Sequence, residues 1–207
     1  MKNRRKIGIF GGTFNPVHNG HIRLAKMYYD QLSLDEMLVI PTNIPPHKDV
    51  DNSVSSDDRL NMLSLAFKDL SYITISDIEL LSEGKNYTII TLNKLLKIYP
   101  DDEFYLIVGG DMFLCFEEWK EYKKILSLCT VCTAPREEGE IQKLLEYQNK
   151  IDPQKKCTIV LNAPVLELSS SEIRSKAVQI TELKEFVPQD VFEYIVEKGL
   201  YNDERYK

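Results

Sequence analysis

The sequence predicts an α/β protein with a doubly wound, mainly parallel β-sheet and a small helical region near its C-terminal end. Strand-like apolar runs alternate with helix-like segments along the chain, and this alternation calls for crossover connections between parallel strands. The chain has 207 residues, of which 43% are hydrophobic, which suffices for one domain with its own core. We therefore expect a single domain over residues 1–207, with residues 164–207 forming a helical subregion packed on it.

The first half of the chain shows three strand patterns separated by two helical ones. Short runs rich in β-branched and apolar residues predict strands, and apolar residues at spacings of three and four predict helices. Ser55 and Asp58 have the spacing of a capping box, which predicts a helix start there. The expected order is a strand over 6–10, a helix over 20–32, a strand over 36–41, a polar loop over 42–54, a helix through 68 and a strand over 72–76.

The second half continues the alternation and ends in short helices. A helix begins after a break at 84–86 and stops before Pro100, because the residue before a proline is biased away from helical geometry. The last helix starts at Pro188 and is ended by Gly199, the usual positions for these residues. In order, we expect a helix over 88–99, a strand over 104–108, a helix over 113–126, a strand over 128–134, a helix over 137–149 and a strand over 156–162.

Composition narrows the class of partners and the compartment. The net charge of −6 lacks the basic excess of a protein that binds duplex nucleic acid. Apolar runs fall far short of the ~20 residues of a membrane span, and the N-terminal segment has no apolar core of a signal peptide. Four cysteines are too sparse for a disulfide framework. We expect a cytoplasmic protein with no nucleic-acid or membrane partner; a homo-oligomer stays open.

Cys129 and Cys132 form a C-x-x-C pair that could indicate a redox or zinc site. They fall within a predicted strand, where residues three apart point to opposite faces. Two such thiols cannot easily share one metal ion. We therefore expect both to be small core residues, and we predict no metal site in the chain.

The segment after the first strand carries the strongest chemical signal. Gly11 and Gly12 allow backbone N–H groups to approach a ligand closely, and the helix that follows favours phosphate at its start. His18 and His21 are three apart at that start, so they share a face and can converge on one anion. The segment matches neither the dinucleotide fingerprint nor the P-loop. Any loss of activity at high pH should then follow removal of the imidazolium charge, near the ordinary histidine pKa of about 6.5, or at a higher pH if neighbouring phosphates raise that pKa.

A second phosphate-binding candidate lies near the C-terminus. Ser169 and Glu172 have capping-box spacing, which places Ser169, Ser170 and Ser171 at a helix start. Arg174 lies one turn further and can direct its guanidinium to the same point. Lys48 follows two prolines that stiffen its loop, and it is a further candidate cation for closing over phosphates.

Two features after the fourth predicted strand indicate a base and a ribose. Trp119, the only tryptophan, can stack on a planar cationic ring such as a pyridinium. Asp111 follows Gly109 and Gly110 at a strand end, where a carboxylate can accept two ribose hydroxyls; the alternative is a helix N-cap.

These motifs together resemble a known family. Gly11 to His21 is similar to the (T/H)-x-G-H segment of the nucleotidyltransferase superfamily and to the whole string of the bacterial nicotinate mononucleotide adenylyltransferases. Four further stretches match the same family in order, and so does the last helix. They are Ile44-Pro45-Pro46-His47-Lys48, Asn86-Tyr87-Thr88, Ile107-Val108-Gly109-Gly110-Asp111 with Trp119, and Leu168-Ser169-Ser170-Ser171-Glu172-Ile173-Arg174.

The resemblance implies a Rossmann-like nucleotidyltransferase fold and adenylyl transfer from ATP to nicotinate mononucleotide, giving deamido-NAD and pyrophosphate. Mg²⁺ would be carried by ATP. The implied catalytic residues are His18, His21, Lys48 and Arg174. The implied ATP-binding residues are Gly11, Gly12, Thr13, Phe14, His18, His21, Ser169, Ser170, Ser171 and Arg174. The implied mononucleotide-binding residues are Tyr87, Thr88, Gly109, Asp111 and Trp119.

Three departures from the family pattern and two alternatives accompany this interpretation. Gly110 stands where the family usually has alanine. Asn15 stands where the family usually has aspartate, which weakens any metal-binding carboxylate there. Arg136 lies in an altered turn, and we assign it no role. The alternatives are an adenylyltransferase that uses nicotinamide mononucleotide or pantetheine phosphate, and a non-catalytic nucleotide sensor. A sensor should lose one histidine of the pair, and both are present.

Overall fold

The computed structural model describes residues 4–43, 54–81, 84–137, 139–162, 170–176 and 180–201. In this part of the chain, six strands form one sheet in the order β3-β2-β1-β4-β5-β6, and every pairing is parallel. The predicted fold class is confirmed. The strands are β1 (Lys6–Gly12), β2 (Glu36–Pro41), β3 (Ile73–Ile75), β4 (Glu103–Ile107), β5 (Thr130–Thr133) and β6 (Thr158–Val160).

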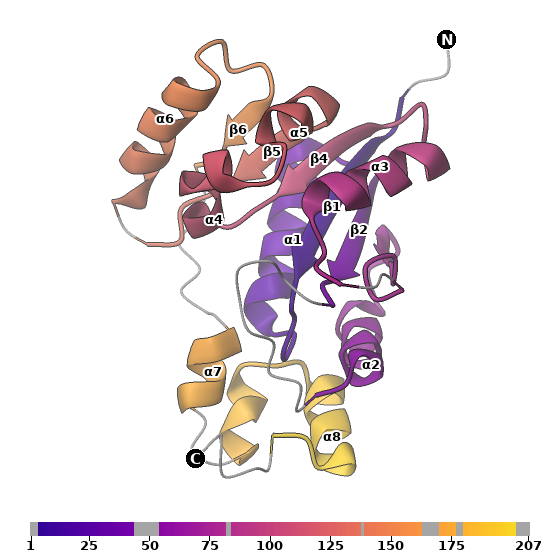
Figure 1. Ribbon diagram of the computed structural model, residues 1–207. Coiled ribbons are helices and arrows are strands. Elements are labelled where there is room, and N and C mark those ends of the chain that lie inside the picture. Colours follow the sequence, from indigo (N-terminus) through magenta and orange to yellow (C-terminus); the bar gives the residue numbers. More distant parts are fainter. Residues whose placement is uncertain are drawn as a thin grey trace.

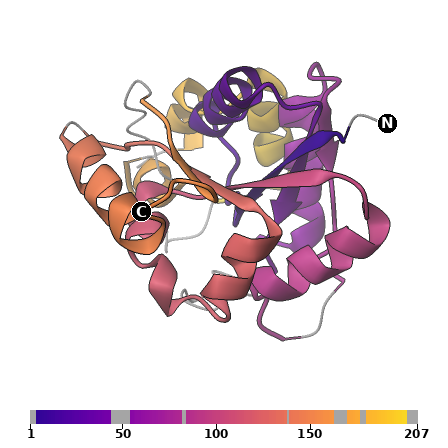
Figure 2. The same ribbon diagram turned by 90° about the horizontal axis from the view of Figure 1, so that it is seen from above.

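Helices cover both faces of the sheet (Figure 2). One hydrophobic cluster joins α1, α2, α7 and α8 to one face, and a second joins α3, α4, α5 and α6 to the other. The helices are α1 (Asn19–Leu32), α2 (Ser56–Phe67), α3 (Thr88–Ile98), α4 (Gly110–Leu114), α5 (Tyr122–Leu128), α6 (Glu140–Ile151), α7 (Ser170–Lys176) and α8 (Gln189–Lys198), with 3₁₀ turns η1 (Phe116–Glu118) and η2 (Ile180–Glu185).

Alternation along the central strands explains the two clusters. In β1, Ile9 packs in the cluster under α3 to α6, whereas Phe10 packs in the cluster under α1 and α2. Successive side chains of a strand point to opposite faces, so a sheet covered on both sides needs apolar residues at every position. β1 pairs with β2 on one side and with β4 on the other. This is the switch point where open α/β sheets bind ligands.

The structure corrects one predicted helix. The segment 113–126 is not continuous but divides into α4, η1 and α5. Trp119 has extended backbone angles, with φ −71° and ψ 140°, and Glu121 is left-handed, with φ 55°. The two halves pack on different partners, α4 on α6 and α5 on α3. Tertiary packing therefore overrides a sequence pattern that contains no glycine or proline to mark the break.

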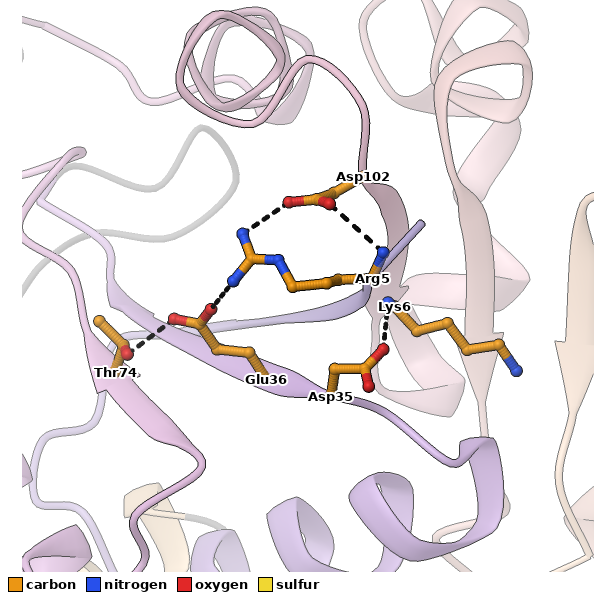
Figure 3. A network of polar contacts seen from close by, with 6 residues as sticks. All are labelled: Arg5, Lys6, Asp35, Glu36, Thr74 and Asp102. Carbon is orange, nitrogen blue, oxygen red and sulfur yellow. Dashed lines mark hydrogen bonds and ion pairs between the residues drawn. The ribbon is translucent and has the colours of Figure 1, made fainter. Parts of the chain in front are cut away.

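Polar contacts join residues at the amino ends of β1, β2 and β4 (Figure 3). Arg5 bridges the Glu36 carboxylate at 3.2 Å and the Asp102 carboxylate at 2.7 Å. Glu36 also accepts a hydrogen bond of 2.8 Å from the Thr74 hydroxyl. Exposed ion pairs contribute little stability each. Their position next to the β2-β1-β4 pairing helps to fix the register of these strands.

Cys129 and Cys132 lie in different hydrophobic clusters on opposite faces of the sheet, as the strand periodicity predicts. Burial raises the pKa of Cys129 to about 12 and that of Cys132 further, so both thiols stay protonated near neutral pH. Within the described ranges, no helix is long and apolar enough to cross a membrane.

Candidate active site

A cavity of about 560 Å³ opens at the carboxyl ends of the central strands. Its walls come from the turn after β1, the ends of β2 and β4, the start of α3, the α4–η1 segment and α7. Lys48 and Ser169 lie outside the described residues. The remaining predicted site residues all line this cavity: Gly11, Gly12, Thr13, Phe14, His18, His21, Tyr87, Thr88, Gly109, Asp111, Trp119, Ser170, Ser171 and Arg174.

The turn after β1 is built around a buried aromatic ring. Phe14 is 1% exposed and has a left-handed backbone with φ 48°, a conformation that costs a residue with a bulky side chain free energy. Its ring lies 5.6 Å from the Phe10 ring and 4.9 Å from the His21 ring, centroid to centroid. A Cβ atom at Gly12 would come within 3.1 Å of this ring. The glycine therefore allows the aromatic packing that holds the turn.

Side chains from the C-terminal region bind the same turn. The Ser170 hydroxyl donates to the Pro16 carbonyl at 3.0 Å, and Arg174 Nη1 donates to the Asn15 carbonyl at 2.5 Å. The Tyr201 hydroxyl donates to Asn15 Oδ1 at 2.5 Å. Figure 1 shows α7 and α8 beyond the carboxyl ends of β1 and β2. Ser170 and Arg174 thus pair carbonyl oxygens that would otherwise repel a phosphate, while both still line the cavity.

The two histidines lie with their rings close together and tilted at the start of α1. Their ring centroids lie 3.7 Å apart with an interplanar angle of 31°. The His18 backbone N–H donates to His21 Nδ1 at 3.2 Å, so Nε2 of His21 carries the proton of the neutral ring. His18 is 1% exposed, and neither of its ring nitrogens has a hydrogen-bond partner among the described residues. A buried polar group without a partner is costly, and His18 also lines the cavity.

The ordinary histidine pKa of about 6.5 expected for the pair is wrong for the free protein. Burial, with Arg136 nearby, lowers the pKa of His18 to about 4. Burial and the neighbouring His18 hold the pKa of His21 well below its ordinary value. Desolvation penalises the charged form of a base, so both imidazoles are neutral near pH 7. They can offer N–H donors to an anion rather than full positive charges.

This burial makes the stability of the protein depend on pH. The unfolded chain binds a proton at His18 near pH 6.5, whereas the folded chain resists it until about pH 4. The unfolded state therefore binds more protons in this window, and the free energy of unfolding falls as pH falls. His18 alone contributes a loss of about 3 kcal/mol between pH 7 and pH 4. Urea unfolding at several pH values in this range measures the free energy of unfolding of the wild type and of His18→Gln. This free energy should depend less steeply on pH in the variant, and an equal pH dependence would contradict the buried neutral ring.

The far end of the cavity holds the aromatic side chains. Tyr87 is the N-cap of α3 and makes no side-chain capping hydrogen bond. The Lys120 ammonium lies 4.5 Å from the centroid of the Tyr87 ring. Trp119 lies next to Lys120 in the chain, and its ring is 5.0 Å from that of Phe116. This end therefore combines an aromatic wall with a cation and the N-terminus of a helix.

Asp111 lies in the first turn of α4 and is exposed. The N-cap of that helix is Gly109, so the alternative interpretation of Asp111 as a cap is wrong. A Cβ atom at Gly109 would come within 2.7 Å of Asp111 Oδ1. Arg136 Nη1 lies 3.8 Å from Asp111 Oδ2 and lines the cavity, so the altered turn still delivers a cation to the site.

The polar residues of the cavity wall that sequence reasoning did not find include Thr42, Arg59, Glu79, Thr91 and Lys120. Arg59 is 3% exposed. The sequence does hold a signal for it, because Arg59 shares a helix face with buried Met62 and Leu63 at spacings of three and four. Glu79 and Thr42 lie in irregular segments, where no periodicity predicts direction.

A parallel doubly wound sheet with a histidine-bearing turn and a cavity at its switch point defines a class, the Rossmann-like nucleotidyltransferases. Residues 9–176 match a family model described as cytidylyltransferase-like. The chain belongs to this family and, within it, to the nicotinate-nucleotide adenylyltransferases.

The membership rests on relatives that match along nearly their whole length. A probable nicotinate-nucleotide adenylyltransferase from Geotalea daltonii is 37% identical, over 97% of this chain and 100% of its own. One of the same description from Lachnoclostridium phytofermentans is 33% identical, over 95% and 99%. The Plasmodium falciparum nicotinic acid mononucleotide adenylyltransferase complexed with NaAD has a TM-score of 0.78 at 22% identity, over 96% of this chain and 98% of that one, which shows the shared fold.

Proposed function

We propose that the protein transfers the adenylyl group of ATP to nicotinate mononucleotide, giving deamido-NAD and pyrophosphate. The observation that carries this proposal is His18, whose buried imidazole lines the cavity with both ring nitrogens unpaired in the described part of the chain. The names of the curated relatives support the choice of substrates.

In the proposed reaction, a 5′-phosphate oxygen of the mononucleotide attacks the α-phosphorus of ATP. The bond from that phosphorus to the bridging oxygen of the β-phosphate breaks, and pyrophosphate leaves. The attacking phosphate is ionised at neutral pH, so no residue must remove a proton. Catalysis of this type relies on positioning and on donors directed at developing charge.

We assign the phosphate end to the turn after β1 and to α7. His18 and His21 would donate from neutral rings, and Thr13 and Phe14 would offer backbone N–H groups. Arg174 would add a cation from the start of α7. Gly11, Gly12, Ser169, Ser170 and Ser171 complete the proposed ATP site, together with Lys48.

Mg²⁺ would be held by the triphosphate itself. Among the residues that the structure describes, no three His, Cys, Asp or Glu side chains come together as a candidate metal site, and Asn15 offers an amide rather than a carboxylate. The protein residues would therefore orient the phosphates while the ion shields their charge.

The mononucleotide would occupy the aromatic end of the cavity. Asp111 beside Gly109 would accept the ribose hydroxyls, and Trp119 would stack on the pyridine ring near Tyr87 and Thr88. A pyrophosphate-release assay with ATP and three acceptors tests the function: nicotinate mononucleotide, nicotinamide mononucleotide and phosphopantetheine. Mass spectrometry should identify deamido-NAD with the first acceptor. Product with phosphopantetheine alone would contradict the proposal.

Trp119→Ala should mainly impair use of the mononucleotide. Stacking of one base on an aromatic side chain contributes about 1–3 kcal/mol, so we expect kcat/KM for the acceptor to fall by about 5- to 150-fold. The KM for ATP should change much less, because the phosphate end lies elsewhere in the cavity. Trp119→Phe should recover part of the loss. Unchanged acceptor kinetics in the alanine variant would show that the indole serves only the core beside Phe116.

A further inference from the structure

A chain of hydrogen bonds runs along the cavity wall, starting at Arg59. Its Nη1 donates to the Thr13 carbonyl at 3.0 Å and to the Thr42 carbonyl at 2.7 Å, and its Nη2 donates to the Ser56 hydroxyl at 3.2 Å. Thr13 follows β1 and Thr42 follows β2. One buried guanidinium therefore fastens the carboxyl ends of two neighbouring strands.

The chain continues from Thr42 to the start of α3. The Glu79 carboxylate accepts hydrogen bonds from the Thr42 side chain and from the Thr91 hydroxyl at 2.7 Å. The Glu79 carbonyl accepts from Asn86 Nδ2 at 3.0 Å. Asn86 and Thr91 flank the segment that holds Tyr87, so Glu79 fixes the wall of the mononucleotide end from both sides.

Thr42 is the residue that both charged groups hold. Arg59 binds its carbonyl oxygen and Glu79 binds its side chain. A buried charged group is costly to leave without partners. Arg59 and Glu79 would each lose a hydrogen bond that offsets this cost if Thr42 moved away from them. A displacement of Thr42 toward one end of the cavity therefore changes the contacts at the other end.

We propose that Arg59 and Glu79 are positioning residues that couple the phosphate-binding turn to the mononucleotide pocket through Thr42. Each residue then affects the binding of the substrate at the distant end as well as at its own. This inference rests on the proposed function for the identity of the two substrates. It goes beyond that function because it assigns a coupling role to residues outside the predicted site.

The first test measures cross effects in two variants, Arg59→Met and Glu79→Gln. We expect Arg59→Met to raise the KM for the mononucleotide as well as that for ATP, and Glu79→Gln to raise the KM for ATP as well as that for the mononucleotide. Residues joined in one network change each other's effects by about 2-fold to over 100-fold. Arg23→Met and Asp77→Asn are matched controls, since both residues are exposed, and should leave both KM values unchanged.

A double-variant cycle distinguishes coupling from simple loss of stability. The fall in kcat/KM for the Arg59→Met, Glu79→Gln double variant should be smaller than the product of the single falls. The Thr42→Val substitution removes the hydroxyl but keeps the carbonyl. In that background, the fall in kcat/KM of the double variant should equal the product of the two single falls. Arg59→Lys should recover part of the activity lost in Arg59→Met, because an ammonium can still donate to both carbonyls.

Calorimetric titration with a non-hydrolysable ATP analogue, with and without the mononucleotide, reads the coupling without turnover. In the wild type, the affinity for the ATP analogue should differ between the titrations with and without the mononucleotide. In Thr42→Val, the two affinities should be equal. Changes confined to the near substrate in each variant, or a fall in melting temperature with unchanged KM values, would overturn the coupling. A wild-type protein that shows the coupling by calorimetry but transfers no adenylyl group would instead overturn the proposed reaction. If Arg59→Met does not fold, Arg59→Lys and Thr42→Val decide the question.

Discussion

His21→Ala should lower kcat by about 10²–10³-fold, the loss measured when one donor to a developing negative charge is removed. In the structure, the His18 backbone N–H occupies Nδ1 of His21, so Nε2–H is the donor available to a phosphate. A donor that strengthens as charge develops acts mainly on kcat. The KM for ATP should therefore change less than kcat.

Two further substitutions separate this donor from the structural role of the ring. His21→Asn can still accept the hydrogen bond from His18 but has no group at the position of Nε2, so it should be as slow as the alanine variant. His21→Gln places an amide donor near that position and should recover part of the rate. Near wild-type kcat in His21→Ala would show that the phosphate donors lie elsewhere in the site.

The pH dependence of kcat/KM offers an independent check. Burial lowers the pKa of both histidines in the free protein, so the profile should show no limb from either ring between about pH 6 and pH 8. An acid limb in that range that disappears in His21→Ala would make His21 a general base and would contradict the proposed mechanism.

The fold was predictable because the pattern of alternating elements is strong. Strand β1 begins at Lys6, and helix α8 ends at Lys198 with Gly199 as its left-handed C-cap, as the apolar run and the glycine indicate. The break between α4 and α5 was not predictable, because Glu121 takes a left-handed conformation that a glutamate in the sequence does not indicate. Local sequence preference is weak compared with tertiary contacts.

The candidate site was predictable where a short motif fixes several side chains in one turn, as at His18 and His21. It was not predictable where a residue acts through distant partners. Arg59 reaches carbonyls that are 46 and 17 positions away in the chain, and no spacing rule links them. The charge state of the histidines was also missed, since desolvation depends on the packing of Phe14 and its neighbours, which spacing alone does not reveal.

The protein should prefer nicotinate mononucleotide over nicotinamide mononucleotide by about tenfold to more than a hundredfold in kcat/KM. The two acceptors differ by a carboxylate in place of a neutral amide. Helix α3 starts at Tyr87 without a side-chain cap and has no acidic residue in its first turn. Its first N–H groups and its dipole therefore favour an anion, while the amide would direct a donor at other donors.

Lys120 supplies a test of the electrostatic part of this preference. Its ammonium lies over the Tyr87 ring and is exposed, so its attraction for a carboxylate is screened by water and salt. Lys120→Gln should reduce the preference by only about 2- to 5-fold, and Lys123→Gln, an exposed neighbour on α5, should leave it unchanged. Steady-state rates with both acceptors measure each value. Because the N–H groups of α3 remain in both variants, most of the preference should survive; equal kcat/KM for the two acceptors in the wild type would contradict an anion pocket at Tyr87.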